Sequence, residues 1–120
     1  MGRPARGGEW ERRAERWLSR RGLRLLARNF HCHQGELDLV MQDGESTVFI
    51  EVRYRQCSAF GSPAASVDMH KQLRIQHAAS IFLVRNPRLA QAPCRFDVLA
   101  ISGRRPWPRF EWLQDAFRLH

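Results

Sequence analysis

The sequence lacks the features that several classes of protein need. Its three cysteines are widely spaced among 120 residues and form no Cys-x-x-Cys motif, so neither a disulfide framework nor a zinc knuckle is indicated. The longest apolar run, from Ala78 to Val84, contains Ser80 and is far shorter than the roughly 20 residues that span a bilayer. Residues 1–6 lack the apolar stretch of a secretory signal. We therefore expect a cytoplasmic protein with no membrane segment.

Lysine is nearly absent, although basic residues are abundant. Of the 20 basic residues 19 are arginines and one, Lys71, is a lysine; against 12 acidic residues this gives a net charge of +8. Seven of the arginines fall within residues 12–28. Such an excess suits a polyanionic partner, and nucleic acid is the commonest one for a small domain. The alternative is a compositional bias towards arginine that merely keeps the protein soluble.

The length and the 43% of hydrophobic residues suffice for one domain with a buried core. We expect a flexible basic arm over residues 1–7 and a single domain over residues 8–120. Apolar spacing predicts a helix from near Gly8 to Gly22 and another over residues 67–84. Alternating patterns predict strands at residues 23–30, 35–40, 48–54 and 95–101, and a strand or short helix at residues 110–117. The order α-β-β-β-α-β with a short tail indicates an α/β fold.

Four charged residues share one face of the hairpin predicted in the middle of the chain. Successive side chains of a strand point to opposite sides, so Glu36 and Asp38 lie on one face of the first strand. By the same rule Glu51 and Arg53 share a face of the second strand. The Asp43-Gly44 pair between the strands is a strong signal for a tight turn.

The turn decides which carboxylates are opposed. If it is centred between residues 44 and 45, Asp38 lies opposite Glu51; if residues 43 and 44 form the turn, Glu36 faces Glu51. Opposed Cβ atoms are about 4.5–5.5 Å apart. Carboxylates this close repel each other unless a cation or a proton lies between them, which predicts a divalent-metal site. The alternative is a solvated polar face with ordinary cross-strand ion pairs.

Apolar neighbours favour the metal site over the solvated face. Val40 and Phe49 flank the charges, so their face is expected to be partly covered. Leu37, Leu39 and Met41 form an apolar opposite face that should be buried. Carboxylates beside apolar groups are the kind whose pKa values are perturbed at functional sites.

Several short segments spread over nearly the whole chain after residue 7 carry a resemblance to known proteins: Gly8-Glu9, Arg28-Asn29-Phe30, residues 35–40, residues 48–55, Phe60-Gly61, Lys71, residues 95–98 and residues 112–117. In these segments the chain resembles the small bacterial YraN (UPF0102) family. Asp38 followed by Glu51-Val52-Arg53 is also similar to the signature of the restriction-endonuclease-like, or PD-(D/E)xK, nuclease superfamily. The resemblance implies that superfamily's mixed sheet flanked by helices, and relatives that include Holliday-junction resolvases. The resemblance does not by itself establish an activity. Together with the carboxylates on one face and the basic charge, it leads to the hypothesis of a divalent-metal-dependent nuclease, or nuclease-fold protein, acting on structured or branched DNA.

The resemblance also implies roles for individual residues. Asp38, Glu51 and the backbone carbonyl of Val52 would bind Mg²⁺ or Mn²⁺. Glu36 would support a second ion or orient these ligands, and Glu9 would approach the cluster from the first helix. Alternatively, Glu9 only stabilises the N-terminal end of its helix dipole.

Arg53 departs from the superfamily, which usually has lysine at this position. Arginine can grip a phosphate but is effectively never deprotonated, so a step that needs a neutral amine could not use it. Arg53 could instead pair with Glu36, which would give it a structural role. Lys71 could then supply the amine from the second helix. The alternative for Lys71 is a simply solvated helix residue. The expected nucleic-acid contacts are Arg53, Arg55, Lys71 and Arg74.

The rival function is a non-catalytic nucleic-acid-binding module with a degenerate site. A homodimer is compatible with the resemblance, although no segment marks an interface.

Overall fold

The computed structural model of the protein describes residues 5–55, 67–103 and 106–118. Phe60 and Gly61, two of the residues in the family resemblance, lie outside these ranges. The elements are α1 (Ala5–Ser19), β1 (Arg24–Cys32), β2 (Gly35–Asp43), β3 (Ser46–Arg55), α2 (Met69–Arg85), α3 (Pro87–Ala90), β4 (Cys94–Ser102) and β5 (Arg109–Phe117). Within the described ranges, no helix is long and apolar enough to cross a membrane.

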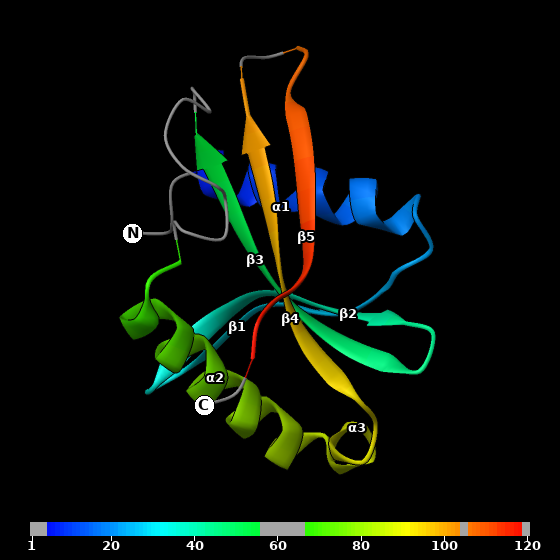
Figure 1. Ribbon diagram of the computed structural model, residues 1–120, viewed down its shortest axis with the longest axis vertical. Coiled ribbons are helices and arrows are strands. Elements are labelled where there is room, and N and C mark those ends of the chain that lie inside the picture. Colours follow the sequence, from blue (N-terminus) through cyan, green and yellow to red (C-terminus); the bar gives the residue numbers. More distant parts are fainter. Residues whose placement is uncertain (1–4, 56–66, 104–105, 119–120) are drawn as a thin grey trace.

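The strands form one mixed sheet in the order β1-β2-β3-β4-β5 (Figure 1). Neighbouring strands are antiparallel except β3 and β4, which are parallel and are joined through α2 and α3. This arrangement confirms the predicted α/β class and its α-β-β-β-α-β order. The segment predicted as a terminal strand or short helix is the strand β5.

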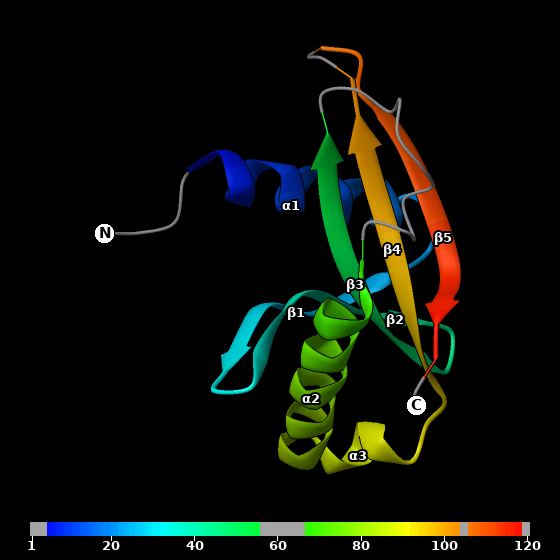
Figure 2. The ribbon, with the colours of Figure 1, turned by 60° about the vertical axis from the view of Figure 1, so that its left-hand side comes forward.

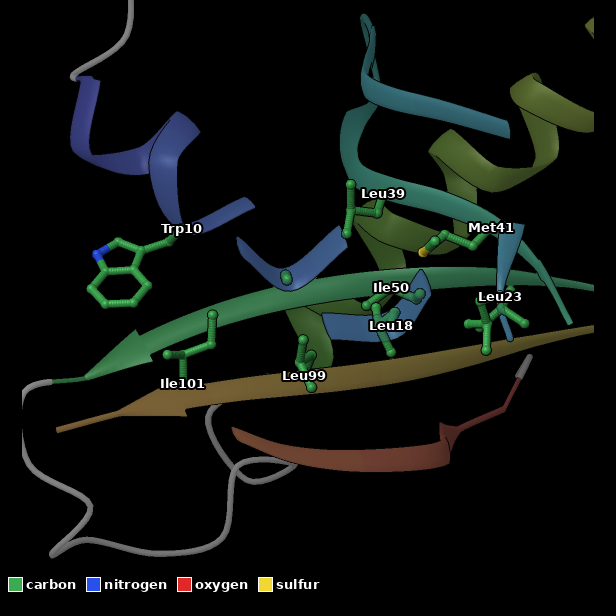
Figure 3. Packing of buried hydrophobic residues seen from close by; sticks show 10 residues of the cluster. Trp10, Leu18, Leu23, Leu39, Met41, Ile50, Leu99 and Ile101 are labelled. Carbon is green, nitrogen blue, oxygen red and sulfur yellow. The ribbon is translucent and has the colours of Figure 1, made fainter. Parts of the chain in front are cut away.

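The two long helices cover opposite faces of the sheet (Figure 2). On one face Leu18 of α1 packs with Leu39 and Ile50 in a cluster of buried side chains (Figure 3). On the other face Phe82 of α2 packs with Phe49 in a second cluster. Ile50 and Phe49 are adjacent in β3, so alternation along this strand fixes which helix each side chain meets.

Helix α1 begins earlier than the sequence pattern predicts. It starts at Ala5, so residues 5–7 are helical rather than part of the expected arm, and residues 1–4 lie outside the described ranges. Ala5 and Arg6 are good helix formers, but Gly7 and Gly8 are poor ones, so helix propensity alone does not account for the extension. The predicted stop at Gly22 is confirmed, because Gly22 has φ +98° and its N–H donates to the Ser19 carbonyl at 3.1 Å. The next N–H donates to the Leu18 carbonyl at 3.2 Å, which completes a Schellman motif.

The hairpin between β2 and β3 adopts the first of the two predicted registers. Asp43 pairs with Ser46, which leaves Gly44 and Glu45 as a two-residue loop. Gly44 has φ +61°, as the first loop position of a type II′ turn requires. Continued beyond the last backbone pair, this register places residue 38 opposite residue 51.

The predicted apolar face of β2 is wrong at one position. Leu37 packs in the α2 cluster, whereas Leu39 and Met41 pack in the α1 cluster. Backbone pairing between β2 and β3 covers residues 39–43 of β2, so the start of this strand is free to twist away from β3. On its other side β1 has a bulge after Leu25 and a left-handed residue, Asn29 (φ +50°), opposite Asp38.

A buried carboxylate holds β4, β5 and the hairpin together. Asp97 is fully buried and accepts hydrogen bonds from Trp112 Nε1 and from the Asp115 N–H, both at 2.8 Å. Arg95 Nε donates to Asp97 at 3.1 Å, and Arg95 Nη2 reaches Asp43 of β2 at 2.9 Å. Asp115 has φ +54°, and the β4–β5 register shifts at Asp97. This network fixes β5 and the base of the hairpin relative to β4.

Candidate functional site

Asp38 and Glu51 meet where the backbone pairing of β2 with β3 ends. The Val52 N–H, which would otherwise continue the sheet, donates to Asp38 Oδ2 at 2.9 Å. The carboxyl groups of Asp38 and Glu51 lie close enough for each to influence the pKa of the other. The pairing of β2 with β3 therefore ends in a hydrogen bond to a side-chain oxygen rather than to a backbone carbonyl, while β3 continues to pair with β4.

The two carboxyl groups do not ionise independently of each other. Glu51 is 5% exposed, and burial raises its pKa to about 7, with the charge of Asp38 adding to the rise and Lys71 and Arg53 opposing it. Burial also raises the pKa of Asp38, against the hydrogen bond from Val52. Without a metal ion the pair therefore holds a proton more tightly than isolated carboxyl groups do.

This raised pKa predicts a loss of stability as pH rises. The ordinary pKa of Glu51 is 4.5, so its contribution is fully present below that value and is lost as pH rises through about 7. The loss is on the order of 3 kcal/mol from the shift of Glu51 alone. We expect urea unfolding in EDTA to show this loss in the wild type but not in Glu51→Gln, whose amide does not titrate. Parallel pH profiles for the two proteins would contradict the assignment.

Two basic side chains reach the same oxygen of Glu51. Arg53 Nη1 lies 3.3 Å and Lys71 Nζ 3.4 Å from Glu51 Oε2. The side chains of Arg53 and Lys71 are 33% and 36% exposed, so both cations line the open side of a buried carboxylate. Lys71 is thus not simply a solvated helix residue.

The first turn of α2 holds Lys71 in place. Asp68 is the N-cap of this helix, with extended backbone (φ −71°, ψ 174°), and its carboxylate accepts a hydrogen bond from the Lys71 N–H at 2.8 Å. This cap fixes the residue that precedes the first turn. Lys71 is therefore in the first turn of α2, at the positive end of the helix dipole, and it reaches Glu51 from there.

Gly35 sets how closely α2 approaches β2, which gives a stability prediction. A Cβ at Gly35 would lie 2.5 Å from the backbone oxygen of Arg74, an atom that cannot move without moving the helix. We expect Gly35→Ala to lower the free energy of unfolding by about 1–3 kcal/mol in urea titrations. The matched control is Gly8→Ala, whose added Cβ meets nothing within 4 Å and which should stabilise α1 by up to about 1 kcal/mol. Equal stabilities for the two variants would contradict the close contact.

The structure places Glu36 and Glu9 differently from the central pair. Glu36 is half-exposed, and its Oε2 lies 3.0 Å from Nδ1 of His31, its partner across β1. Its charge also raises the pKa of Asp38. Glu9 is half-buried on α1, next to Trp10, whose ring stacks on Tyr54 of β3 at 4.2 Å. Glu36 is therefore electrically coupled to the site, whereas Glu9 belongs to the helix on the opposite face.

The two remaining predicted contacts lie around the site. Arg55 is the last residue of β3 and is half-buried, and its carbonyl accepts a hydrogen bond from the Gly103 N–H at 3.2 Å. Arg74 is exposed on α2 and follows Lys71 by three residues, so both lie on the same side of the helix.

The donor set fits a hard divalent cation. Across the described residues no three His, Cys, Asp or Glu side chains form a group that could hold a metal ion. The available oxygens are the two carboxylates, joined by the Val52 carbonyl that the family resemblance implies. Mg²⁺ keeps several waters and is commonly bound through one or two carboxylates, whereas zinc requires more nitrogen or sulfur ligands. A cation would also reduce the repulsion between the buried carboxylate of Glu51 and the half-buried one of Asp38.

Sequence reasoning missed two residues that support the site. Asp68 could have been found as an N-cap, because it directly precedes the helical pattern. His31 could be assigned as the partner of Glu36 only once the β1–β2 register was known.

Fold and site define an α/β protein with a five-stranded mixed sheet and a pair of carboxylates, one buried and one half-buried, on its central hairpin beside the second long helix. The family model described as "Uncharacterised protein family UPF0102" matches residues 10–101. The chain belongs to the UPF0102 family, as its sequence pattern predicts.

Proteins from several bacteria are similar to it over nearly their whole length. A UPF0102 protein of Xanthomonas campestris is 50% identical over 117 residues, which cover 98% of this chain and 94% of the relative. A UPF0102 protein of Alcanivorax borkumensis is 46% identical, over 92% of this chain and 90% of the relative. The UPF0102 protein YraN of Salmonella arizonae is also 46% identical, over 95% and 85% respectively.

Proposed function

We propose that this protein is a divalent-metal-dependent nuclease acting on DNA, with structured or branched DNA as its substrate. The observation that carries the proposal is the carboxylate pair: half-buried Asp38 and buried Glu51 lie close together, and the pKa of each is raised, mainly by burial. Two basic side chains stand beside the pair, and the chain carries a net charge of +8, which suits a phosphate polymer.

Each residue of the site has a role in this proposal. Asp38, Glu51 and the carbonyl of Val52 would hold Mg²⁺ or Mn²⁺. The bound ion supplies a water of lowered pKa and neutralises charge on the scissile phosphate. With an ion at the pair, both carboxyl groups would be ionised, and Lys71 and Arg53 would no longer be the only counter-charges of Glu51. Both cations could then contact the phosphate.

In this proposal Lys71 supplies from helix α2 the amine that the superfamily usually has on the strand. Substitutions of Lys71 and of Arg53 should therefore have unequal effects on cleavage. Lys71→Met should lower the cleavage rate at saturating Mn²⁺ by about 100-fold, because it removes a donor aimed at developing charge. Arg53→Lys should change the rate by less than about 10-fold, since it keeps the charge of the strand residue. Arg88→Met, on the exposed helix α3, is the matched control and should cleave like the wild type. Full activity of Lys71→Met would remove Lys71 from the site.

The direct test uses purified protein with Mn²⁺ or Mg²⁺ and a panel of branched, duplex and single-stranded DNA. The proposal expects cleavage that requires the metal and is lost in the Asp38→Ala and Glu51→Ala variants. Cleavage that persists in both variants would point to a contaminating nuclease and would overturn the assignment.

The rival is a nucleic-acid-binding module with a degenerate nuclease site. It is favoured by the contacts of Glu51 with Arg53 and Lys71, since two cations already balance this carboxylate without a metal ion. Calorimetry separates the two functions. A nuclease should bind Mn²⁺ with heat that disappears in Glu51→Gln, whereas the degenerate module should bind DNA in a salt-dependent way and take up no Mn²⁺ at this pair.

A further inference from the structure

A second basic surface lies on the face of the sheet that α1 covers, opposite the side of α2. It is a groove of about 430 Å³ between α1 and the turn that joins β4 to β5. Three arginines of α1 line one side of this groove, and two prolines and a phenylalanine line the other. These residues are Arg13, Arg16 and Arg20, with Pro106, Pro108 and Phe110.

The three arginines present their charges to solvent along one side of α1. Their spacing of three and then four residues places them on the same side of the helix, over about 10 Å. Arg16 and Arg20 are exposed, and the Arg13 guanidinium lies 5.0 Å from the ring of Trp10. Within the described parts of the chain none of the three is ion-paired with a carboxylate, in contrast to Arg28, which contacts Glu15 at 2.7 Å. The groove therefore carries positive charge that no described carboxylate balances by direct contact.

One tryptophan that is adjacent in sequence to two lining residues of the groove is open to solvent. Trp107 is 82% exposed and lies between the two prolines that line the groove. Trp17 also lines the groove, but Phe110 stacks on its ring at 5.2 Å and the Arg21 guanidinium lies 3.4 Å from its centroid. Trp107 is thus the tryptophan with a free face for an incoming ring, and Pro106 and Pro108 limit the backbone freedom around it.

We propose that this groove binds an unpaired DNA strand, with phosphates on Arg13, Arg16 and Arg20 and a base stacked on Trp107. An acidic protein would match the charge but would leave the exposed indole unused. A single strand matches both features, since it combines a regular row of phosphates with bases whose faces are open. The choice of DNA rests on the proposed function, whereas the groove itself is separate from the carboxylate pair. A branched substrate has unpaired segments that could occupy this groove beside the duplex that is cut.

The test measures the anisotropy of a fluorescent oligothymidine of about 10 nucleotides, in EDTA so that no cleavage occurs. Trp107→Ala should weaken binding by about 10-fold, the typical loss for one stacked base. The Arg16→Glu/Arg20→Glu variant should weaken binding further and reduce the slope of log affinity against log salt by about 1.4, for two lost phosphate contacts. Arg88→Glu, a charge reversal on α3, should leave the slope unchanged within about 0.3.

Two further measurements keep the interpretation clear. Thermal unfolding should be unchanged in these variants, because the substituted side chains are exposed. Asp38→Ala should bind the oligothymidine like the wild type, so a failure of the nuclease proposal would leave this binding intact. Unchanged affinity in both Trp107→Ala and Arg16→Glu/Arg20→Glu would overturn the groove assignment. Equal binding of a duplex of the same length, insensitive to Trp107, would overturn the assignment to an unpaired strand.

Discussion

Asp38→Asn and Glu51→Gln should each lower the rate of metal-dependent DNA cleavage by at least about 100-fold, since an ion at this pair contributes several kcal/mol to stabilising the transition state. Both substitutions keep the size of the side chain and remove one negative charge. Because each charge lies beside a second carboxyl group and burial raises the pKa of both, its loss should not destabilise the fold. The effect should therefore appear in the cleavage rate and in metal affinity, but not as a lower melting temperature.

A matched control comes from the same hairpin. Glu45 lies in its exposed two-residue loop, so Glu45→Gln removes one carboxylate without touching the site. This variant should cleave at the wild-type rate. If Glu45→Gln and Glu51→Gln have the same activity, the carboxylate pair is not the catalytic centre.

Asp97→Ala should lower the free energy of unfolding by about 3–5 kcal/mol, which is a large part of the stability of a domain of this size. Asp97 is fully buried and accepts hydrogen bonds from Trp112, the Asp115 N–H and Arg95. Alanine would leave all three donors without this acceptor. Urea unfolding followed by tryptophan fluorescence measures the loss.

Two companion variants separate the buried network from its exposed branch. Asp43→Asn removes one charge from the contact with Arg95, which is partly exposed, and should cost no more than about 1 kcal/mol. Asp97→Asn keeps the shape of the side chain and remains measurable if the alanine variant does not fold. An Asp97→Asn variant as stable as Asp43→Asn would contradict the assigned importance of the buried carboxylate.

Local rules predicted the centre of the site from the sequence. Alternation in a strand placed Asp38 and Glu51 on one face, and an even loop containing Gly44 kept them there. Lys71 was identified as a candidate by the family resemblance, and its approach to Glu51 depends on a cap and on the contact of α2 with Gly35.

Other features depend on packing between distant segments, which periodicity does not encode. Leu37 packs on the α2 face of the sheet because the pairing of β2 with β3 ends before it and because β1, on the other side of β2, is irregular. The partner of Glu36 depends on the register of β1, which brings His31 opposite it. Asp97 was part of the family match, but its role as a buried acceptor requires the β4–β5 register. For the same reason, the groove between α1 and the prolines before β5 could not be predicted from the arginine cluster alone.

A crystal structure of the protein soaked in Mn²⁺ tests the existence of the metal centre most directly. The anomalous scattering of manganese identifies the ion without reference to activity. We expect an anomalous peak about 2.2 Å from one oxygen each of Asp38 and Glu51 and from the Val52 carbonyl, with waters in the remaining positions. Lys71 should then have moved away from Glu51. A map with no peak at this pair, in which Lys71 and Arg53 still contact Glu51, would contradict the metal centre and would favour a nucleic-acid-binding protein without catalysis.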